Sequence, residues 1–589
     1  MANFSPVREG ARMRGTYLIA VLAVLALALA LRGGEGHAQA VPPLPQLPLP
    51  EPTLTPSLPP PTPAPTPEPP AEPVPVAPEV TPPAAAPEAA PEAVPAGEPP
   101  LADAPPAPVP ADPVVASIRS TLADPVLRKD AHADDLAALE AVYAARSAPL
   151  WMTEMGFSTK AQAALFEIEK AGDWGLERTA FELPLSSALP TSVEAQALAE
   201  LKLNLAILRY ARAARGGRFT PSAISSLFDQ RPPLRDPKSV LAEIEVADAA
   251  DAYLQSLHPK HEQFALLRQA LLKARGEDTG EAGAEPHADD VGVKRLLINM
   301  ERWRWMPENL GSLHVWNNSP EFMLYVVKDG KRIYADKILV GTIGYATPVF
   351  TADMKTIVFN PDWIAPPTVV KENILPHLKS KRFGILKSHR LFVSYQGKPV
   401  DATRIDWNRV NGMAYTFLQK TGPHNNLGKI KFLYPNRHTV YMHDTLPVRK
   451  KYFKQPVRLI GHECVRMEQP LRFAEVLLAE ANGTSAARAK ELWDKSDNGS
   501  VAIGKKMPVH MVYFTAMVDD EGKVRTVADV YGLDRKMATA MFGSATGFPQ
   551  PPPESKTPPP GEASASTPAA RRTTADNDMA RAMQGFFGD

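Results

Sequence analysis

The sequence contains one cysteine, Cys464, in the segment Gly461-His462-Glu463-Cys464-Val465-Arg466. A cysteine acts as a nucleophile in its thiolate form, which nearby cations and the N–H groups at the start of a helix stabilise. The apolar spacing of Leu471–Leu478 predicts a helix soon after Cys464, and Arg466 is two residues away. We therefore expect Cys464 at a strand-to-helix turn, with the pKa of its thiol lowered.

A nucleophilic cysteine also needs a general base, and two histidines are candidates. His462 precedes the cysteine by two positions, and His443 lies in the segment Thr439-Val440-Tyr441-Met442-His443-Asp444-Thr445. On a strand, Tyr441 and His443 share one face. A lone cysteine can equally be a small buried apolar residue, and a histidine at a strand end a structural one. These residues alone leave both interpretations open.

The cysteine count limits the remaining chemistry. One cysteine excludes an intramolecular disulfide and a cysteine-rich zinc or iron–sulfur site. The histidines do not have the spacing of a His-Glu-x-x-His metal motif. We therefore expect no metal and no cofactor.

The charges are unevenly distributed along the chain. It has 65 Lys and Arg against 65 Asp and Glu. Residues 291–545 carry 38 basic and 23 acidic side chains, a net charge of +15 (38 minus 23), so the remainder carries −15. The two halves are therefore expected to have different roles. We expect no nucleic-acid partner.

The first 40 residues have the pattern of an export signal. A basic start is followed by the apolar run Tyr17–Leu31 and by the small-x-small pattern Ala38-Gln39-Ala40. As a helix this run would span about 22 Å, less than the hydrocarbon core of a membrane. We expect residues 1–40 to be a signal peptide and the mature protein to lie outside the cytoplasm. An uncleaved inner-membrane anchor is the alternative, and the only membrane contact expected.

Proline divides the chain into regions. Of 63 prolines, 30 lie in residues 42–113 and 8 in residues 546–589, a composition that favours extended, disordered chain over a packed core. We expect a disordered proline-rich linker at 41–113 and a similar tail at 546–589, two arms that could recruit envelope proteins. The chain between them is expected to form a helical scaffold domain (114–275), a linker (276–290) and a mainly-β, α+β domain (291–545).

The periodicity of apolar residues predicts the elements of these two domains. Helices are expected at Ala195–Arg215, where Gly216-Gly217 end it, and at Ser239–Ser256, His261–Arg275 and Val291–Trp303. Strands are expected at Glu321–Val327 and Ile333–Val340, joined by a type I′ turn at Asp329-Gly330, and at Thr356–Phe359, Lys429–Tyr434, Thr439–His443 and Val457–Ile460.

Several segments of residues 291–480 resemble the L,D-transpeptidase family with a YkuD-type catalytic domain, and most closely its large periplasmic YcbB-like members. They occur in the family's order. They are Glu301-Arg302-Trp303-Arg304-Trp305, Thr347-Pro348-Val349-Phe350, Phe359-Asn360-Pro361-Asp362-Trp363, Asn426-Leu427-Gly428, Tyr441-Met442-His443-Asp444-Thr445 and Cys464-Val465-Arg466. The helical region resembles the scaffold domain of such enzymes.

The resemblance implies a cysteine acyltransferase that removes the terminal D-alanine from peptidoglycan tetrapeptide stems. Cys464 would attack the carbonyl of the third stem residue and form a thioester, and an amine of a second stem would resolve it into a 3→3 cross-link. His443 would be the base, and its neighbour Asp444 would fix the tautomer through its backbone carbonyl. Backbone N–H groups of Glu463 and Cys464 would form the oxyanion hole.

Three further side chains are implied as substrate contacts or pocket support. They are Tyr441, Arg466 and Trp363, and for Trp363 a role in the core is equally expected. The partner implied by the resemblance is the peptidoglycan stem peptide.

The nucleophile turn departs from the family pattern. The family has Ser/Thr-His-Gly-Cys, whereas this chain has Gly461-His462-Glu463-Cys464. If position 463 needs a positive φ, glutamate costs about 1 kcal/mol relative to glycine, and its carboxylate would raise the pKa of the thiol. Two alternatives therefore remain: a catalytically impaired peptidoglycan-binding scaffold protein, and an L,D-carboxypeptidase or enzyme that attaches proteins to peptidoglycan.

Overall fold

The structure, a computed structural model, describes residues 112–184, 190–277 and 291–552. All of these lie in one compact unit, Asp103–Asp589. The expected signal peptide, almost all of the proline-rich linker, most of the 276–290 linker and most of the C-terminal tail fall outside the described residues. No helix within the described ranges combines the length and the apolar character that crossing a membrane requires.

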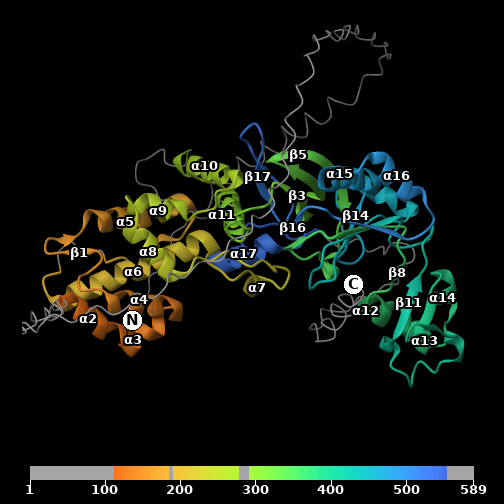
Figure 1. The fold of residues 1–589 in the computed structure, drawn as a ribbon, viewed down its shortest axis with the longest axis horizontal. Coiled ribbons are helices and arrows are strands. Elements are labelled where there is room, and N and C mark those ends of the chain that lie inside the picture. Colours follow the sequence, from red (N-terminus) through yellow and green to blue (C-terminus); the bar gives the residue numbers. More distant parts are fainter. Residues whose placement is uncertain (1–111, 185–189, 278–290, 553–589) are drawn as a thin grey trace, which may run out of the picture. The chain divides into compact units, whose positions relative to one another are not determined.

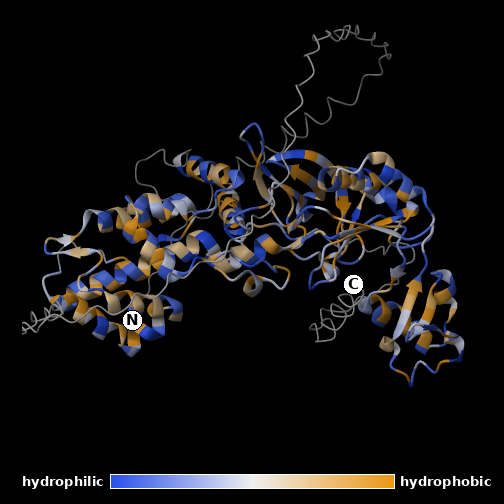
Figure 2. Cartoon of the chain, viewed as in Figure 1, coloured by the Kyte–Doolittle hydropathy of each residue, from blue (hydrophilic) through white to orange (hydrophobic). Residues whose placement is uncertain are grey.

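The first part of the described chain is helical, with one small hairpin of β1 (Met152–Thr153) and β2 (Gly156–Phe157). Its helices are α2 (Pro113–Leu122), α3 (Pro125–Asp130), α4 (Ala133–Ala145), α5 (Thr159–Glu169), α6 (Val193–Gly216), α7 (Pro221–Ile224), α8 (Pro237–Val246), α9 (Ala250–Ser256) and α10 (Glu262–Glu277). Figure 2 shows hydrophobic and hydrophilic residues on the same helices, as expected where one side of each helix is buried.

The longest helix, α6, has the expected position. Ser192 caps it by accepting a hydrogen bond from the N–H of Ala195 at 3.1 Å. Leu201, Leu205 and Leu208 are buried in the core of the helical part, whereas Leu198 is 44% exposed. The helix ends where Gly217 takes a φ of 81°. A Cβ there would lie 2.6 Å from the Glu301 and Trp305 side chains, so the end of the helix requires glycine.

The prediction of one continuous helix at Ser239–Ser256 is wrong, because the structure has two helices in this segment, α8 and α9. Ala247 and Ala249 between them are extended, with ψ angles of 140° and 120°. The bend brings Ile244 and Leu254 into the same core. Burial of both apolar faces therefore overrides the continuous helical pattern.

The second part contains a ten-stranded sheet with the order β15-β7-β12-β13-β14-β5-β4-β3-β16-β6. Its strands are β3 (Leu313–Asn318), β4 (Met323–Lys328), β5 (Lys331–Leu339), β6 (Phe350–Asp353), β7 (Thr356–Phe359), β12 (Ile430–Leu433), β13 (Met442–His443), β14 (Val465–Met467), β15 (Gly499–Ala502) and β16 (Pro508–Val512). The turn between β4 and β5 is as expected, since Asp329 and Gly330 have φ angles of 48° and 78°.

Helices flank this sheet (Figure 1). They are α11 (Val291–Arg304), α15 (Pro470–Asn482), α16 (Ala486–Asp494) and α17 (Leu533–Phe542). On α15, Phe473 is buried against Phe432 of β12, with ring centroids 4.8 Å apart. A separate hairpin joins β17 (Ala516–Val518) to β18 (Val524–Thr526). A helical part followed by a β-rich part confirms the expected fold class.

Two strand predictions near the sheet centre are wrong in extent. The expected strand Thr439–His443 shortens to β13, because Thr439 takes a φ of 55°, which a strand cannot contain. The expected strand Val457–Ile460 is reduced to an isolated bridge between Leu459 and Val340. Both shortened segments lie next to the cysteine and histidine named above.

A second sheet is inserted between β7 and β12, and the sequence patterns did not predict it. Its order is β10-β9-β11-β8, and its elements are β8 (Trp363–Ile364), β9 (Phe392–Tyr395), β10 (Lys398–Pro399), β11 (Tyr415–Gln419), α12 (Pro367–Val369), α13 (Leu375–Lys379) and α14 (Gly384–Ser388). We call residues 363–419 the inserted subdomain. It has a core of its own around Trp407, Phe417 and Trp363, so it is a packed unit rather than a loop.

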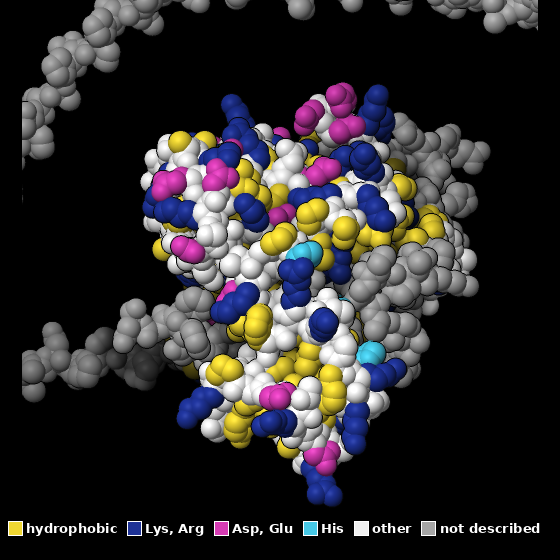
Figure 3. Space-filling view, turned by 90° about the vertical axis from the view of Figure 1, so that its right-hand side faces the viewer, with side chains coloured by type: hydrophobic (Ala, Val, Ile, Leu, Met, Phe, Trp, Pro, Cys, Tyr) yellow, Lys and Arg dark blue, Asp and Glu magenta, His cyan; other side chains and the backbone are white. Residues whose placement is uncertain are grey.

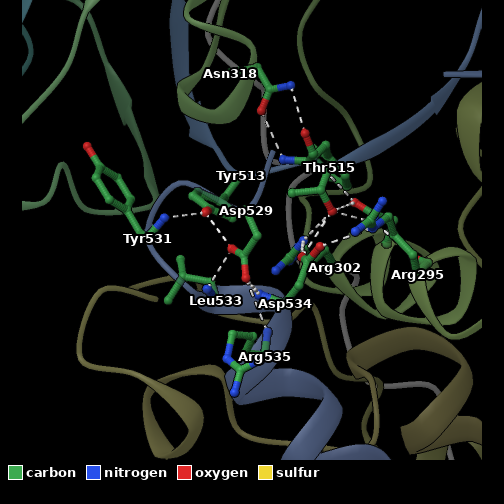
Figure 4. Close-up of polar contacts among 12 residues, drawn as sticks. Arg295, Arg302, Asn318, Tyr513, Thr515, Asp529, Tyr531, Leu533, Asp534 and Arg535 are labelled. Atoms are coloured by element: carbon green, nitrogen blue, oxygen red, sulfur yellow. Dashed lines mark hydrogen bonds and ion pairs between the residues drawn. The ribbon is translucent and has the colours of Figure 1, made fainter. Parts of the chain in front are cut away.

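A buried polar network joins α11 to the segment that leads into α17 (Figure 4). Arg302 donates to the Asp534 carboxylate at 2.7 Å, and both side chains are at most 2% exposed. Thr515 donates to the same carboxylate at 3.0 Å. Asp529 accepts hydrogen bonds from the Tyr513 hydroxyl at 2.6 Å and from the N–H groups of the first turn of α17. The network fixes the path of residues 513–534.

Candidate active site

His443 and Cys464 come from neighbouring parallel strands. In the register of β13 and β14, Met442 is opposite Val465 and His443 is opposite Arg466, and Cys464 is the residue immediately before β14. Both side chains line one cavity of about 130 Å³. Four other predicted site residues, Trp363, Tyr441, His462 and Arg466, line the same cavity.

The inserted subdomain supplies the opposite wall of this cavity. Its lining residues include Trp363, Val369, Ile374 and Leu391. Trp363 is 8% exposed and belongs to the core of the subdomain, so the structure supports both roles expected for it, as core residue and as cavity wall. An apolar wall facing a thiol and an imidazole excludes water from the place where an acyl group would react.

The surroundings of Cys464 act against the expected pKa shift. Burial raises the pKa of the thiol to about 11, and the backbone of Tyr441 and the Arg466 guanidinium lower it only in part. The residue retains partial exposure at the cavity wall. The expected strand-to-helix turn is also wrong, because Cys464 is followed by the strand β14, and α15 begins only at Pro470. Helix-start N–H groups therefore do not reach the thiol.

His443 is equally buried, at 3% exposure. Burial lowers the pKa of its imidazole well below the usual value, and the charges of Arg466 and Arg449 lower it further. The backbone of Asp444 and of Leu427 has the opposite, weaker effect. Among the described residues, Nδ1 of His443 has no hydrogen-bond partner. The site at rest is a neutral thiol beside a neutral imidazole, which can accept the thiol proton as the thiol attacks.

Asp444 lies apart from the other predicted site residues. Its carboxylate forms an ion pair with Lys450 at 2.9 Å and accepts the N–H of Lys429 at 3.0 Å. A Cβ on Gly428 would lie 2.4 Å from the same carboxylate. The side chain lines a second cavity of about 580 Å³ and not the one shared by His443 and Cys464. Any influence of Asp444 on His443 therefore passes through its backbone.

In the turn before Cys464, the residue with a positive φ is Gly461, at 83°. A Cβ at Gly461 would lie 2.5 Å from the Arg466 guanidinium, which donates to the Ile460 carbonyl at 2.9 Å. Glu463 is not among the residues with positive φ, so the condition for backbone strain at this glutamate is not met. Its carboxylate does raise the pKa of Cys464 by its charge, as expected.

Two residues that the sequence analysis did not select hold this turn. Thr347 donates a hydrogen bond from Oγ1 to the Glu463 carbonyl at 2.8 Å and accepts one from the Gly341 N–H at 3.0 Å. The Tyr531 hydroxyl donates to the Gly341 carbonyl at 2.8 Å and accepts the Thr347 N–H at 3.3 Å. Thr347 lies in a segment that supported the resemblance, whereas nothing in the local sequence of Tyr531 connects it with Cys464.

His462, the other candidate base, is held by an aromatic contact. Its ring stacks on Tyr345 with centroids 4.1 Å apart and an interplanar angle of 10°. Tyr345 in turn donates a hydrogen bond from its hydroxyl to Glu372 of the inserted subdomain. His462 therefore lines the cavity as part of an aromatic pair.

Comparison with known proteins agrees with this arrangement. Residues 137–271 match the scaffold domain family, and residues 312–510 match the family of the L,D-transpeptidase catalytic domain, YkuD. The chain therefore carries a YkuD-type L,D-transpeptidase catalytic domain preceded by a scaffold domain. Cys464 and His443 both lie inside the matched catalytic region.

A similar curated protein is the "Putative L,D-transpeptidase" of Haemophilus influenzae. It is 31% identical over 249 residues, which are 42% of this chain and 50% of that protein. The alignment thus spans half the length of the relative.

Within the described ranges, no three His, Cys, Asp or Glu side chains are grouped so that they could hold a metal ion.

Proposed function

We propose that this protein is an exported cysteine L,D-transpeptidase that acts on peptidoglycan tetrapeptide stems in the periplasm. The observation that carries the proposal is the placement of Cys464 and His443 on adjacent parallel strands, facing one cavity inside a matched L,D-transpeptidase catalytic domain. The resemblance of the motifs around both residues supports the same activity.

In the first half-reaction, Sγ of Cys464 attacks the carbonyl carbon of the third stem residue while His443 takes the thiol proton. The carbon–sulfur bond forms, the bond to the D-alanine nitrogen breaks, and the proton passes from His443 to the leaving amine. The raised pKa of Cys464 and the lowered pKa of His443 favour proton transfer during attack over a preformed ion pair. The product is a thioester and free D-alanine.

The oxyanion in this step would be held by backbone N–H groups of Glu463 and Cys464. The Glu463 carbonyl and the Cys464 N–H belong to the same planar peptide group and point in opposite directions. Because Thr347 fixes that carbonyl by a hydrogen bond of 2.8 Å, it also fixes the direction of the Cys464 N–H. Preorganised donors of this kind supply a large part of catalysis in acyl transfer.

In the second half-reaction, a side-chain amine of another stem attacks the thioester carbonyl, the carbon–sulfur bond breaks, and the amine proton returns to sulfur through His443. The result is a 3→3 cross-link. Attack by water instead would make the protein an L,D-carboxypeptidase, and attack by a protein amine would attach that protein to the wall. The apolar residues that the inserted subdomain adds to the cavity lining limit the access of water, and we propose cross-linking as the main reaction.

The basic catalytic half fits a carboxylate-bearing polymer. Within the inserted subdomain alone, nine Lys and Arg face three Asp and Glu. Figure 3 shows Lys and Arg side chains spread over the face of the molecule that includes this subdomain. Such a surface raises the local concentration of an anionic substrate near the cavity.

The proposal is tested by incubating the full chain with disaccharide-tetrapeptides and analysing the products by mass spectrometry. We expect a cross-linked dimer, released D-alanine and a covalent adduct at residue 464, all absent in Cys464→Ala. Release of D-alanine without a dimer would identify the carboxypeptidase. Absence of both the products and the adduct would refute the enzyme and leave a peptidoglycan-binding scaffold protein.

A further inference from the structure

The helical part contains an aromatic and cationic cluster that the proposed reaction does not use. The indole of Trp174, in the 3₁₀ turn Lys170–Trp174, stacks on the ring of His258 with centroids 4.2 Å apart and an angle of 6°. The Arg268 guanidinium of α10 lies 3.8 Å from the centroid of the same indole. The indole is thus in contact with both the imidazole and the guanidinium.

Hydrogen bonds to the Trp174 and His258 rings fix the position of the stacked pair. Trp174 Nε1 donates to the buried Glu167 carboxylate at 2.7 Å, and the Gln255 amide donates to the other oxygen of this carboxylate at 2.8 Å. Nε2 of His258 contacts the Tyr210 hydroxyl at 2.9 Å. The cluster is therefore preorganised rather than a chance contact of surface side chains.

Two hollows adjoin at this cluster. One, of about 250 Å³, is lined by Trp174, Phe264 and Arg268 among others. The other, of about 170 Å³, is lined by Arg215, Arg235 and Glu308 among others. Ser256, His258 and Lys260 line both. We call the two hollows together the Trp174 cleft.

The cleft is lined by more basic than acidic side chains. Its lining contains four Lys and Arg side chains and one carboxylate, Glu308. Arg215 pairs with Glu308 at 2.8 Å, and Arg235 pairs with Glu243 at 2.7 Å. In the part of the chain that the structure describes, Lys260 and Arg268 form no ion pair. These two cations are thus available to a ligand.

Buried donors in the cleft also lack partners. The Arg215 side chain is 3% exposed, and its Nη2 has no hydrogen-bond partner among the described residues. Nδ1 of His258, a residue 3% exposed, also has no partner among the described residues, and it is a donor in the tautomer whose Nε2 accepts from the Tyr210 hydroxyl. A buried polar group without a partner costs free energy, and an anion entering the cleft would remove that cost.

We propose that the Trp174 cleft binds a carboxylate group of the peptidoglycan peptide, as a second attachment point for the polymer on which Cys464 acts. The identity of the polymer rests on the proposed function. A guanidinium and an ammonium group recognise a carboxylate through charge-assisted hydrogen bonds. Each hollow taken alone is smaller than the roughly 300 Å³ or more of sites that enclose a drug-sized ligand, so each hollow is suited to one residue of the peptide.

A second attachment point matters for a polymer and not for a short soluble stem. Once one site holds the polymer, binding at the other becomes intramolecular, at an effective concentration that geometry sets. Loss of the cleft should therefore weaken binding to intact peptidoglycan while leaving turnover of a soluble disaccharide-tetrapeptide unchanged.

The test measures binding of the full chain, carrying Cys464→Ala, to isolated peptidoglycan sacculi by co-sedimentation. Loss of a hydrogen bond to a charged group corresponds to about tenfold in affinity or more. We expect that loss for Lys260→Ala and for Arg268→Ala. Lys238→Ala is the matched control, since Lys238 is an exposed lysine of the same helical part outside the cleft, and it should bind as the parent does.

Arg268→Ala also removes packing from Trp174, so the exposed Lys260 carries the test independently. Sacculi whose carboxylates have been converted to methylamides should bind the parent as weakly as untreated sacculi bind Lys260→Ala. Equal binding by Lys260→Ala and the parent, or an equal loss in Lys238→Ala, would overturn the proposal. If the chain with Cys464 forms no thioester but Lys260→Ala still weakens binding to sacculi, the proposed enzymatic activity is refuted and the proposed binding role of the cleft is retained.

Discussion

At the scale of single residues, the proposed nucleophile is a protonated thiol. Burial is the largest effect on Cys464 and raises its pKa to about 11, while Arg466 and the Tyr441 backbone counteract it only in part. Burial likewise lowers the pKa of His443. In the proposed mechanism both groups start neutral, and the thiol loses its proton to His443 during attack rather than reacting as a standing thiolate.

This resting state predicts a specific pH dependence for alkylation of Cys464. Iodoacetamide reacts with the thiolate, whose fraction rises about tenfold per pH unit below the pKa. With a pKa of about 11, the rate should rise without levelling from pH 7 to pH 10, as followed by mass spectrometry of the full chain. An ordinary thiol would begin to level near pH 8.5 to 9. Levelling below pH 9 would contradict the buried, protonated thiol.

The glutamate beside the nucleophile has an electrostatic effect and not a conformational one. Glu463 is not in the positive-φ region, and its charge raises the pKa of Cys464. Glu463→Gln should therefore shift the alkylation profile to lower pH. Glu468→Gln, a change of a partly buried acid four residues after Cys464, should leave it in place because Glu468 does not act on this thiol. An unchanged profile in Glu463→Gln would rule out the electrostatic effect.

At the scale of elements, the best sequence predictions were those of helices, turns and strands that depend on the local pattern of residues. The helix α6, the β4–β5 turn at Asp329-Gly330 and the strand β7 follow directly from apolar spacing and turn chemistry. The shortened β13 and the bridge at Leu459 do not, because pairing partners distant in sequence decide where a strand begins and ends. The inserted subdomain was missed for the same reason.

In the candidate site, too, the features set by local sequence were predictable and those set by distant contacts were not. The Cys464, His443, Tyr441 and Arg466 cluster was predictable because residue type and order carry the resemblance. The direction of the Cys464 pKa shift was not, since it depends on burial by elements that the local sequence does not reveal. Tyr531 reaches the nucleophile turn only through contacts with Gly341 and Thr347, residues almost two hundred positions earlier in the chain.

Tyr531 is therefore predicted to be a positioning residue for the nucleophile turn. Tyr531→Phe removes the hydroxyl that holds Gly341 and Thr347, and with it the fixed direction of the Cys464 N–H. We expect kcat for D-alanine release to fall about tenfold, less than the roughly 10²–10³ that loss of an oxyanion donor costs, because the donor itself remains, while KM changes little. Steady-state kinetics on a disaccharide-tetrapeptide measure both.

Tyr334→Phe is the control for that change. Its hydroxyl also donates to a backbone carbonyl, that of Gln469 at 3.2 Å, so the variant loses a comparable hydrogen bond outside the turn. Its kcat should stay near that of the parent. A rise in KM without a change in kcat for Tyr531→Phe, or an equal loss of kcat in Tyr334→Phe, would show that Tyr531 has no special role.

At the scale of the whole molecule, the β-rich part extends beyond the matched region 312–510 on both sides. Helix α11 precedes this region, and the segment leading into α17 follows it. Arg302 and Asp534 join these flanks through a buried ion pair, and the same network fixes the segment that contains Tyr531 (Figure 4). The flanks are thus part of the folding unit that forms the site.

Replacing only one residue of the Arg302–Asp534 ion pair should destabilise the protein strongly. Asp534→Ala leaves the Arg302 guanidinium buried without its carboxylate, which costs about 3 to 5 kcal/mol. We expect the midpoint of urea unfolding, followed by tryptophan fluorescence, to fall clearly below that of the parent. The double variant Arg302→Met with Asp534→Leu should recover most of this loss, because it removes the two buried charges and keeps apolar volume in their place, while Arg295, which also pairs with Asp534, is 16% exposed.

The exposed pair of Arg404 and Asp401, with side chains 86% and 56% exposed, provides the comparison. Arg404→Ala should leave the unfolding midpoint unchanged, since solvent screens such pairs. If Asp534→Ala unfolds at the same urea concentration as Arg404→Ala, the buried network does not hold the flanks together. If the double variant is as unstable as Asp534→Ala, the loss comes from altered packing and not from the uncompensated charge of Arg302.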